Sequence, residues 1–169
     1  MSRSGYVYEE DEDNTLGLWR GAVRSAIRGK RGQQALKKIS EALDNMPDKR
    51  LIAASLVSEE GEFCTLGVLG KARGIDMENI NPDDWDEVAQ TFNMAPAMVR
   101  EIVYENDECL HTYEWVEHEI CGPVRQHWPE YGSHIREVQV KVPEDVLARK
   151  RWKHMKEWVD SAIVDKEKT

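Results

Sequence analysis

The sequence predicts a mainly α (α+β) fold: a single compact multi-helix domain with a small β element. Three observations indicate this class. Apolar residues recur at three- and four-residue spacing, glycine and proline mark the ends of these segments, and only residues 138–142 alternate apolar with polar side chains. The 169 residues are enough for one domain with a real hydrophobic core, which we expect over residues 14–165.

The chain is expected to begin with a disordered acidic tail, residues 1–13, because this run of acidic residues lacks apolar anchors. A first helix is expected to follow Asn14 or Thr15, either of which can cap it, with one apolar stripe at helical spacing. The stripe consists of Leu16, Trp19, Val23 and Ile27. Gly29 and Gly32 are expected to break this helix, and a second helix follows them and ends at Pro47.

Three further helices are expected in the middle of the chain. The first covers residues 64–73 and stops at Gly74, because glycine is the usual residue just after a helix. Asn81 marks the clearest helix start, since it can cap a helix that has proline in its first turn. Pro96 opens the next helix, and the helical spacing of apolar residues is expected to continue through residues 108–121.

The remaining segments complete the predicted fold. Residues 51–57 fit either a short helix or a buried strand. The alternating valines of residues 138–142 predict a strand, and Pro143 with the two acidic residues after it predicts the start of a last helix.

Charge is distributed unevenly along this chain, whose net charge is −9. Residues 51–121 carry sixteen acidic and three basic side chains, a net −13, whereas residues 16–50 carry nine basic and three acidic ones, a net +6. Such asymmetry concerns partners rather than fold. It raises the question whether the basic stretch faces solvent or lies against the protein's own acidic residues.

The leading functional hypothesis is a non-enzymatic protein that binds a partner with a basic surface, such as a protein that handles nucleic acid, through an acidic surface of its own. Oriented charge of this kind speeds encounter and sets specificity. The residues expected at this partner-binding surface are Asp83, Asp84, Asp86, Glu87, Glu101, Glu105, Asp107 and Glu108.

The alternative is a nucleic-acid-binding accessory protein that contacts phosphates through a basic ridge at residues 20–31. The ridge consists of Arg20, Arg24, Arg28, Lys30 and Arg31. Residues 83–103 have the spacing of a helix-turn-helix, but the second helix offers only Arg100 among several acidic residues. We therefore expect that unit to be a packed helical hairpin and not a DNA reader.

A metal- or cysteine-dependent enzyme is the third hypothesis. The weak candidates for zinc ligands are Cys109, His111, His118 and Cys121. Cys64 stands at an expected helix start, where the helix dipole lowers a thiol pKa, but no motif supplies a base beside it. We expect no catalytic residue, no bound metal and no cofactor.

The sequence also bears on the compartment. No apolar run approaches the ~20 residues of a membrane span, and the first fifteen residues lack the apolar core of a secretory signal. Three cysteines form no disulfide framework, which fits a reducing compartment. We therefore expect a cytoplasmic protein with no membrane partner.

Several motifs agree in order and spacing with a known group of proteins: "MSRSGY", "LWRGAVRSAIRGKRGQ", "RLIA", "CTLGVLGKARGIDM" and "EIVYENDE". On these motifs the chain resembles a family of small uncharacterised phage and prophage proteins, from Met1 to about Glu108 and again at "RWKHMKEWVDSAI". Residues 109–148 look like an insertion relative to that family. The resemblance implies a viral accessory protein in the cytoplasm of an infected bacterial host cell, and the basic partner is then expected to be a host or defence protein. It implies no activity and no functional residues.

Overall fold

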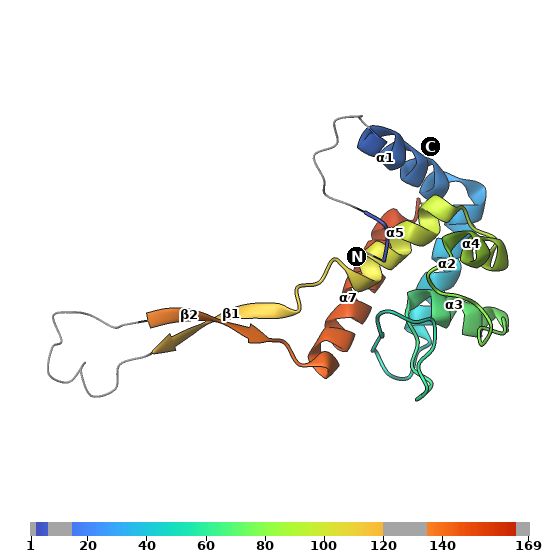
Figure 1. The fold of residues 1–169 in the computed structure, drawn as a ribbon. Helices are drawn as coiled ribbons and strands as arrows, with labels where there is room; N and C mark the ends of the chain where they lie inside the picture. Colours follow the sequence, from blue (N-terminus) through green and yellow to red (C-terminus); the bar gives the residue numbers. More distant parts are fainter. Residues whose placement is uncertain (1–2, 7–14, 120–134, 165–169) are drawn as a thin grey trace, which may run out of the picture.

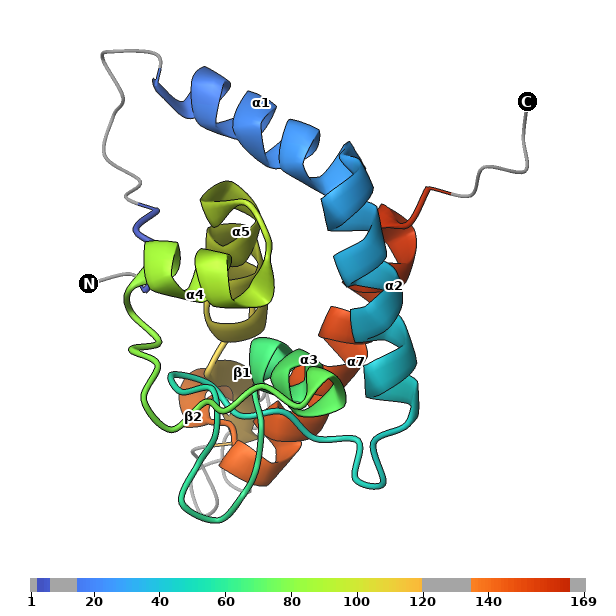
Figure 2. The same cartoon turned by 90° about the vertical axis from the view of Figure 1, so that its right-hand side faces the viewer.

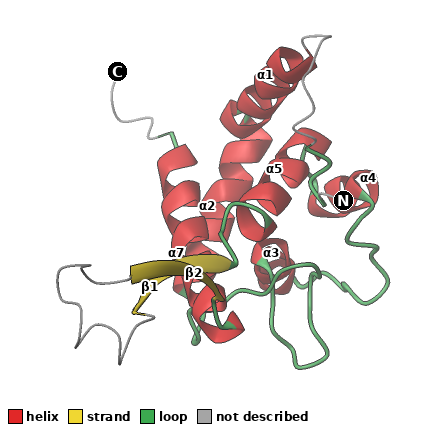
Figure 3. Ribbon diagram, turned by 60° about the vertical axis from the view of Figure 1, so that its left-hand side comes forward, coloured by secondary structure: helices red, strands yellow, loops and turns green. Residues whose placement is uncertain are grey.

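The computed structural model describes residues 3–6, 15–119 and 135–164 of the chain. Over these residues the chain forms six helices and one two-stranded antiparallel sheet. The helices gather into one body, and the two strands extend away from it as a hairpin (Figure 1 and Figure 3). The predicted mainly α domain with a small β element is therefore confirmed.

Helices α1 (Thr15–Arg28) and α2 (Lys30–Asp44) follow each other with only Gly29 between them. Gly29 has extended dihedral angles (φ −63°, ψ 153°) and interrupts the helix as predicted. The predicted break at Gly32 is wrong, because Gly32 lies inside α2. A Cβ atom on Gly32 would lie 2.0 Å from the carbonyl oxygen of Ala26, so the tight corner between the helices requires glycine there.

Helix α3 (Thr65–Arg73) begins and ends as the sequence predicts. The Cys64 sulfur accepts a hydrogen bond from the backbone N–H of Gly67 at the first turn. Gly74 ends the helix in the left-handed conformation, with φ +67°, which glycine adopts without strain.

Helices α4 (Trp85–Phe92) and α5 (Pro96–Asp107) form the helical hairpin expected in this region. The predicted cap at Asn81 is wrong, because Asp84 caps α4 and accepts hydrogen bonds from two backbone N–H groups of the first turn. Asn81 instead stabilises the turn before the helix by accepting from the backbone N–H of Asp83. Both residue types favour caps and turns, so the sequence alone does not separate the two roles.

The β-hairpin, called the hairpin from here on, consists of β1 (Tyr113–Glu119) and β2 (Ile135–Lys141). The strands pair from Tyr113 opposite Lys141 to Glu119 opposite Ile135. The helix expected through residues 108–121 is therefore wrong. Aromatic and β-branched side chains in β1 favour a strand, and pairing with β2 overrides the helical spacing. The strand predicted around residues 138–142 is confirmed.

Helix α7 (Glu144–Ala162) begins after Pro143, as predicted, and packs against α2 and α5 (Figure 2). These helices and α3 enclose the hydrophobic core, in which each fully buried large side chain stabilises the fold by roughly 1.5–3 kcal/mol. The largest of these side chains belong to Leu36, Ile39, Leu43, Leu51, Leu69, Phe92, Met98, Ile102, Leu147 and Met155. Among the described helices, none combines the length and the hydropathy that crossing a membrane requires.

Gly67 offers a test of this packing, because a Cβ atom there would lie 1.9 Å from the Leu56 carbonyl oxygen. We expect Gly67→Ala to lower the free energy of unfolding by ~1–3 kcal/mol through overpacking. Gly21→Ala is the matched control, since Gly21 lies on the exposed side of α1 with no neighbouring atom within 4 Å. It should raise stability by ~0.5–1 kcal/mol. Urea unfolding measures both changes, and a Gly67→Ala protein as stable as wild type would contradict the packing of α3 on residue 56.

Candidate functional site

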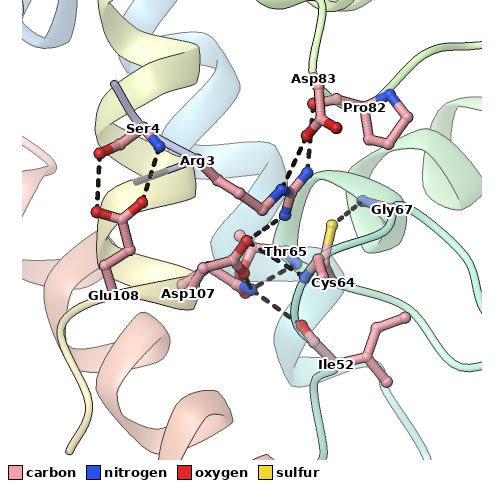
Figure 4. Close-up of polar contacts among 12 residues, drawn as sticks. Arg3, Ser4, Ile52, Cys64, Thr65, Gly67, Pro82, Asp83, Asp107 and Glu108 are labelled. Carbon is pink, nitrogen blue, oxygen red and sulfur yellow. Dashed lines mark hydrogen bonds and ion pairs between the residues drawn. The ribbon is translucent and has the colours of Figure 1, made fainter. Parts of the chain in front are cut away.

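Residues 3 and 4 are bound to acidic side chains just before α4 and at the end of α5 (Figure 4). The Arg3 guanidinium forms ion pairs with Asp83, at 2.9 Å, and with Asp107. The backbone N–H and the hydroxyl of Ser4 donate to the two carboxylate oxygens of Glu108 at 2.8 and 2.9 Å. Three acids predicted for a partner-binding surface therefore hold a segment of the protein itself.

Arg100 fixes the same segment from the side of α5. Its Nε and Nη2 atoms donate to the carbonyl oxygens of Ser4 and Gly5 at 2.7 and 3.1 Å. Its guanidinium also lies over the rings of Trp19 and Trp85, 4.1 and 4.5 Å from their centroids. In a helix-turn-helix, Arg100 would contact DNA bases. Here it is a structural residue that joins α5 to residues 4 and 5, to α1 and to α4.

Tyr6 completes this contact. Its ring packs against Trp19 and Tyr104, with centroids 4.9 and 5.0 Å apart. Its hydroxyl donates to the carboxylate of Glu101. Burial raises the pKa of Tyr6, and the neighbouring Glu101 raises it further, so this hydroxyl remains a hydrogen-bond donor over the whole neutral range.

The disordered tail expected over residues 1–13 is wrong for its described part, residues 3–6. The physical reason is that the positive charge of Arg3 and the aromatic ring of Tyr6 give this segment contacts with the folded body. The run of acidic residues after them offers neither kind of group. The rest of the expected tail, residues 1–2 and 7–13, lies outside the described residues.

The other predicted acids are divided between the start of α4 and the α5 helix. Asp84 and Asp86 are exposed at the start of α4, where Asp84 also serves as the helix cap. Glu87 accepts from the backbone N–H of Asn81 at 3.1 Å. Glu105, in the last turns of α5, contacts His154 of α7 and Cys109 instead of the N-terminal segment. The eight acids therefore do not form one open surface.

The basic ridge faces solvent. All five of its side chains are exposed, and none forms an ion pair with any residue in the described ranges. Arg20, Arg24 and Arg28 line a shallow groove of about 310 Å³ between α1 and α5, together with Glu101. The described acids of residues 51–121 thus pair with Arg3 and leave the basic ridge exposed.

The hairpin exposes large apolar side chains on both of its faces. Trp115 is 66% exposed, and Tyr113, Val116, Val138 and Val140 are also exposed. The two strands contact mainly each other, and an ion pair between Glu114 and Lys150 of α7 links them to the body. The sequence did not predict this surface, because residues 108–121 were expected to form a helix.

The two thiols that the structure describes, those of Cys64 and Cys109, do not suit nucleophilic chemistry. Burial raises the pKa of Cys64 to about 11, which outweighs the expected effect of the helix dipole. Burial, together with a hydrogen bond to Glu105, raises the pKa of Cys109 to about 12. Both thiols are therefore protonated at neutral pH, and the reactive form of cysteine, the thiolate, is scarce.

The four weak zinc candidates are not brought together over their described members. His111 is exposed before β1, and His118 is exposed within β1. Cys121 lies outside the described residues. Cys109 lies near different groups of metal-ligand type, Glu105 and His154, with ligand atoms within 4.8 Å of one another. The sequence shows a spacing of four between Glu105 and Cys109 but gives no signal that pairs either residue with His154.

Comparison of the chain with protein-family models, with curated proteins and with solved structures found no match. The resemblance to phage proteins remains an expectation from the sequence motifs.

The bound N-terminal segment predicts a large effect of Arg100→Ala. The substitution removes two charge-assisted hydrogen bonds and the contacts with the aromatic rings, so unfolding should become easier by ~2–3 kcal/mol. Arg24→Ala is the matched control on the exposed ridge and should stay within ~0.5 kcal/mol of wild type. Urea unfolding followed by circular dichroism makes the comparison, and equal stabilities of the two variants would refute the role given to Arg100.

Proposed function

We propose that this protein is a non-enzymatic, phage-encoded accessory protein that binds a host or defence protein with a basic surface. The observation that carries the proposal is the hairpin of β1 and β2, which extends away from the helices and exposes Trp115 with several valines (Figure 1). The protein would act in the cytoplasm of an infected bacterial cell.

An isolated two-stranded sheet is only marginally stable in water, and exposed apolar patches commonly mark sites of association. Tryptophan is also among the residues that contribute most to protein–protein affinity. A hairpin that packs little on its own body, yet carries Trp115 and the pair Val116 and Val138 on its two faces, has the properties of an interaction element.

The charges of the hairpin favour a basic partner. Glu117 lies directly opposite Glu137, on the same face as Trp115. Like charges placed opposite each other destabilise a sheet, and a lysine or arginine from a partner would relieve this repulsion. The same cation would also be attracted to the face of the Trp115 ring.

The exposed acids at the start of α4 add to the negative charge that a basic partner would meet. Asp84 and Asp86 are open to solvent, whereas Glu101, Asp107 and Glu108 are held by the N-terminal segment. The proposal therefore moves the main binding surface from the acids of α4 and α5 to the hairpin, with Asp84 and Asp86 contributing long-range attraction.

Nucleic-acid binding through the basic ridge is the second candidate. The observation in its favour is that Arg20, Arg24, Arg28, Lys30 and Arg31 are all exposed. Phosphate contacts need this exposure, and the affinity they give falls steeply with salt.

The proposal predicts that Trp115 is at the interface. A photo-cross-linking amino acid at position 115 of the tagged protein, made in infected cells, should capture a basic protein that mass spectrometry identifies. With that protein purified, Trp115→Ala should weaken binding at least about tenfold. Glu117→Gln with Glu137→Gln should reduce the salt dependence of binding.

Leu18→Ala is the matched control, because Leu18 is a large apolar residue that is 78% exposed on α1, away from the hairpin. It should leave binding unchanged. Equal binding by the Trp115→Ala and Leu18→Ala proteins would refute the hairpin as the binding element. If the protein instead retains only nucleic acid at low salt, and the Arg24→Glu, Arg28→Glu double variant does not, the second candidate is supported.

A further inference from the structure

Three side chains of metal-ligand type meet where α5 packs against α7. Glu105 Oε2 lies 2.7 Å from Nε2 of His154 and 3.2 Å from Sγ of Cys109. Glu105 and Cys109 are four residues apart at the end of α5, and His154 approaches from the middle of α7. The Glu105 and His154 side chains are only 14% and 32% exposed, so this contact is sheltered from water.

The distances are close to those of a metal site. Zinc binds carboxylate, imidazole and thiolate at about 2.0–2.3 Å, which places neighbouring ligand atoms of a tetrahedron about 3.4–3.6 Å apart. To admit an ion, Glu105 Oε2 would have to move less than about 1 Å away from His154 Nε2 and from Cys109 Sγ, and these two atoms lie within 4.8 Å of each other. One oxygen, one nitrogen and one sulfur atom together suit zinc better than magnesium or calcium, which prefer oxygen alone.

We propose that Glu105, Cys109 and His154 form a binding site for a single Zn²⁺ ion. On binding, the S–H bond of Cys109 breaks, its sulfur binds the ion and its proton passes to solvent. The proton that Nε2 of His154 shares with Glu105 is released to solvent or replaced by one on Nδ1, so that neutral imidazole binds the ion through Nε2. Glu105 exchanges its two hydrogen bonds for a bond to the ion. One thiolate and one carboxylate then balance the charge of the ion, and water takes the fourth position.

The place of this site gives it a structural consequence. Cys109 lies just before the hairpin, four residues ahead of Tyr113, where β1 begins. The ion would link the end of α5 to α7 at the point where the chain leaves the helical body. This inference does not depend on the proposed function, although it predicts a more rigid base for the hairpin.

Titration of the reduced, metal-free, full-length protein with Co²⁺ tests the proposal, since Co²⁺ takes zinc sites and reports thiolate ligands through a near-ultraviolet charge-transfer band. We expect the band to appear with a stoichiometry of one, and Zn²⁺ to displace the Co²⁺. Zinc should also raise the melting temperature. Absence of the band and of any zinc-dependent stabilisation would overturn the site.

Variants locate the ion. His154→Gln and Glu105→Gln should each weaken Co²⁺ binding at least about tenfold, and Cys109→Ser should abolish the charge-transfer band. His111→Gln and His118→Gln are the matched controls and should bind as wild type. Circular dichroism and a cooperative melt check that each variant is folded. Loss of the band in the control variants or in Cys121→Ser, with His154→Gln unaffected, would place the metal elsewhere and refute the proposal.

Discussion

The position of Arg100 is the constraint on which much of this fold depends. Its guanidinium is hydrogen-bonded to the backbone of residues 4 and 5 and lies against two tryptophan rings, one from α1 and one from α4. A planar cation with several fixed donors can make both kinds of contact at once, which a lysine cannot. Through this one side chain, α5 fixes the start of the chain, the first helix and the fourth.

This arrangement changes the meaning of the acidic block. A net charge of −13 over residues 51–121 looks like a surface for a basic partner, yet α5 uses most of its acid inside the molecule. Glu101, Asp107 and Glu108 hold the N-terminal segment, and Glu105 meets Cys109 and His154. The charge open to a partner lies elsewhere, on the hairpin and at the start of α4.

Local signals in the sequence predicted much of the fold, because Gly74 and Pro96 determine helix ends through their own backbone preferences. The strand Tyr113–Glu119 was missed because strand pairing depends on a segment that follows more than fifteen residues later. The contacts of Arg100 and the approach of His154 to Glu105 are also long-range, so no spacing in the sequence reveals them. Residue types thus predicted the positions of the helices. Which charged side chains remain exposed to a partner was decided by tertiary contacts.

Amide hydrogen exchange at Ser4 tests the bound N-terminus most directly, because this backbone N–H donates to Glu108 at 2.8 Å only when the segment is in place. Nuclear magnetic resonance measures the rate for this one amide. The structure predicts exchange at least about tenfold slower than in an unfolded peptide, and the loss of this protection in Glu108→Ala. Exchange of the wild-type Ser4 amide at the rate of an unfolded peptide would contradict it, and the carboxylates of α5 would then be open to a partner.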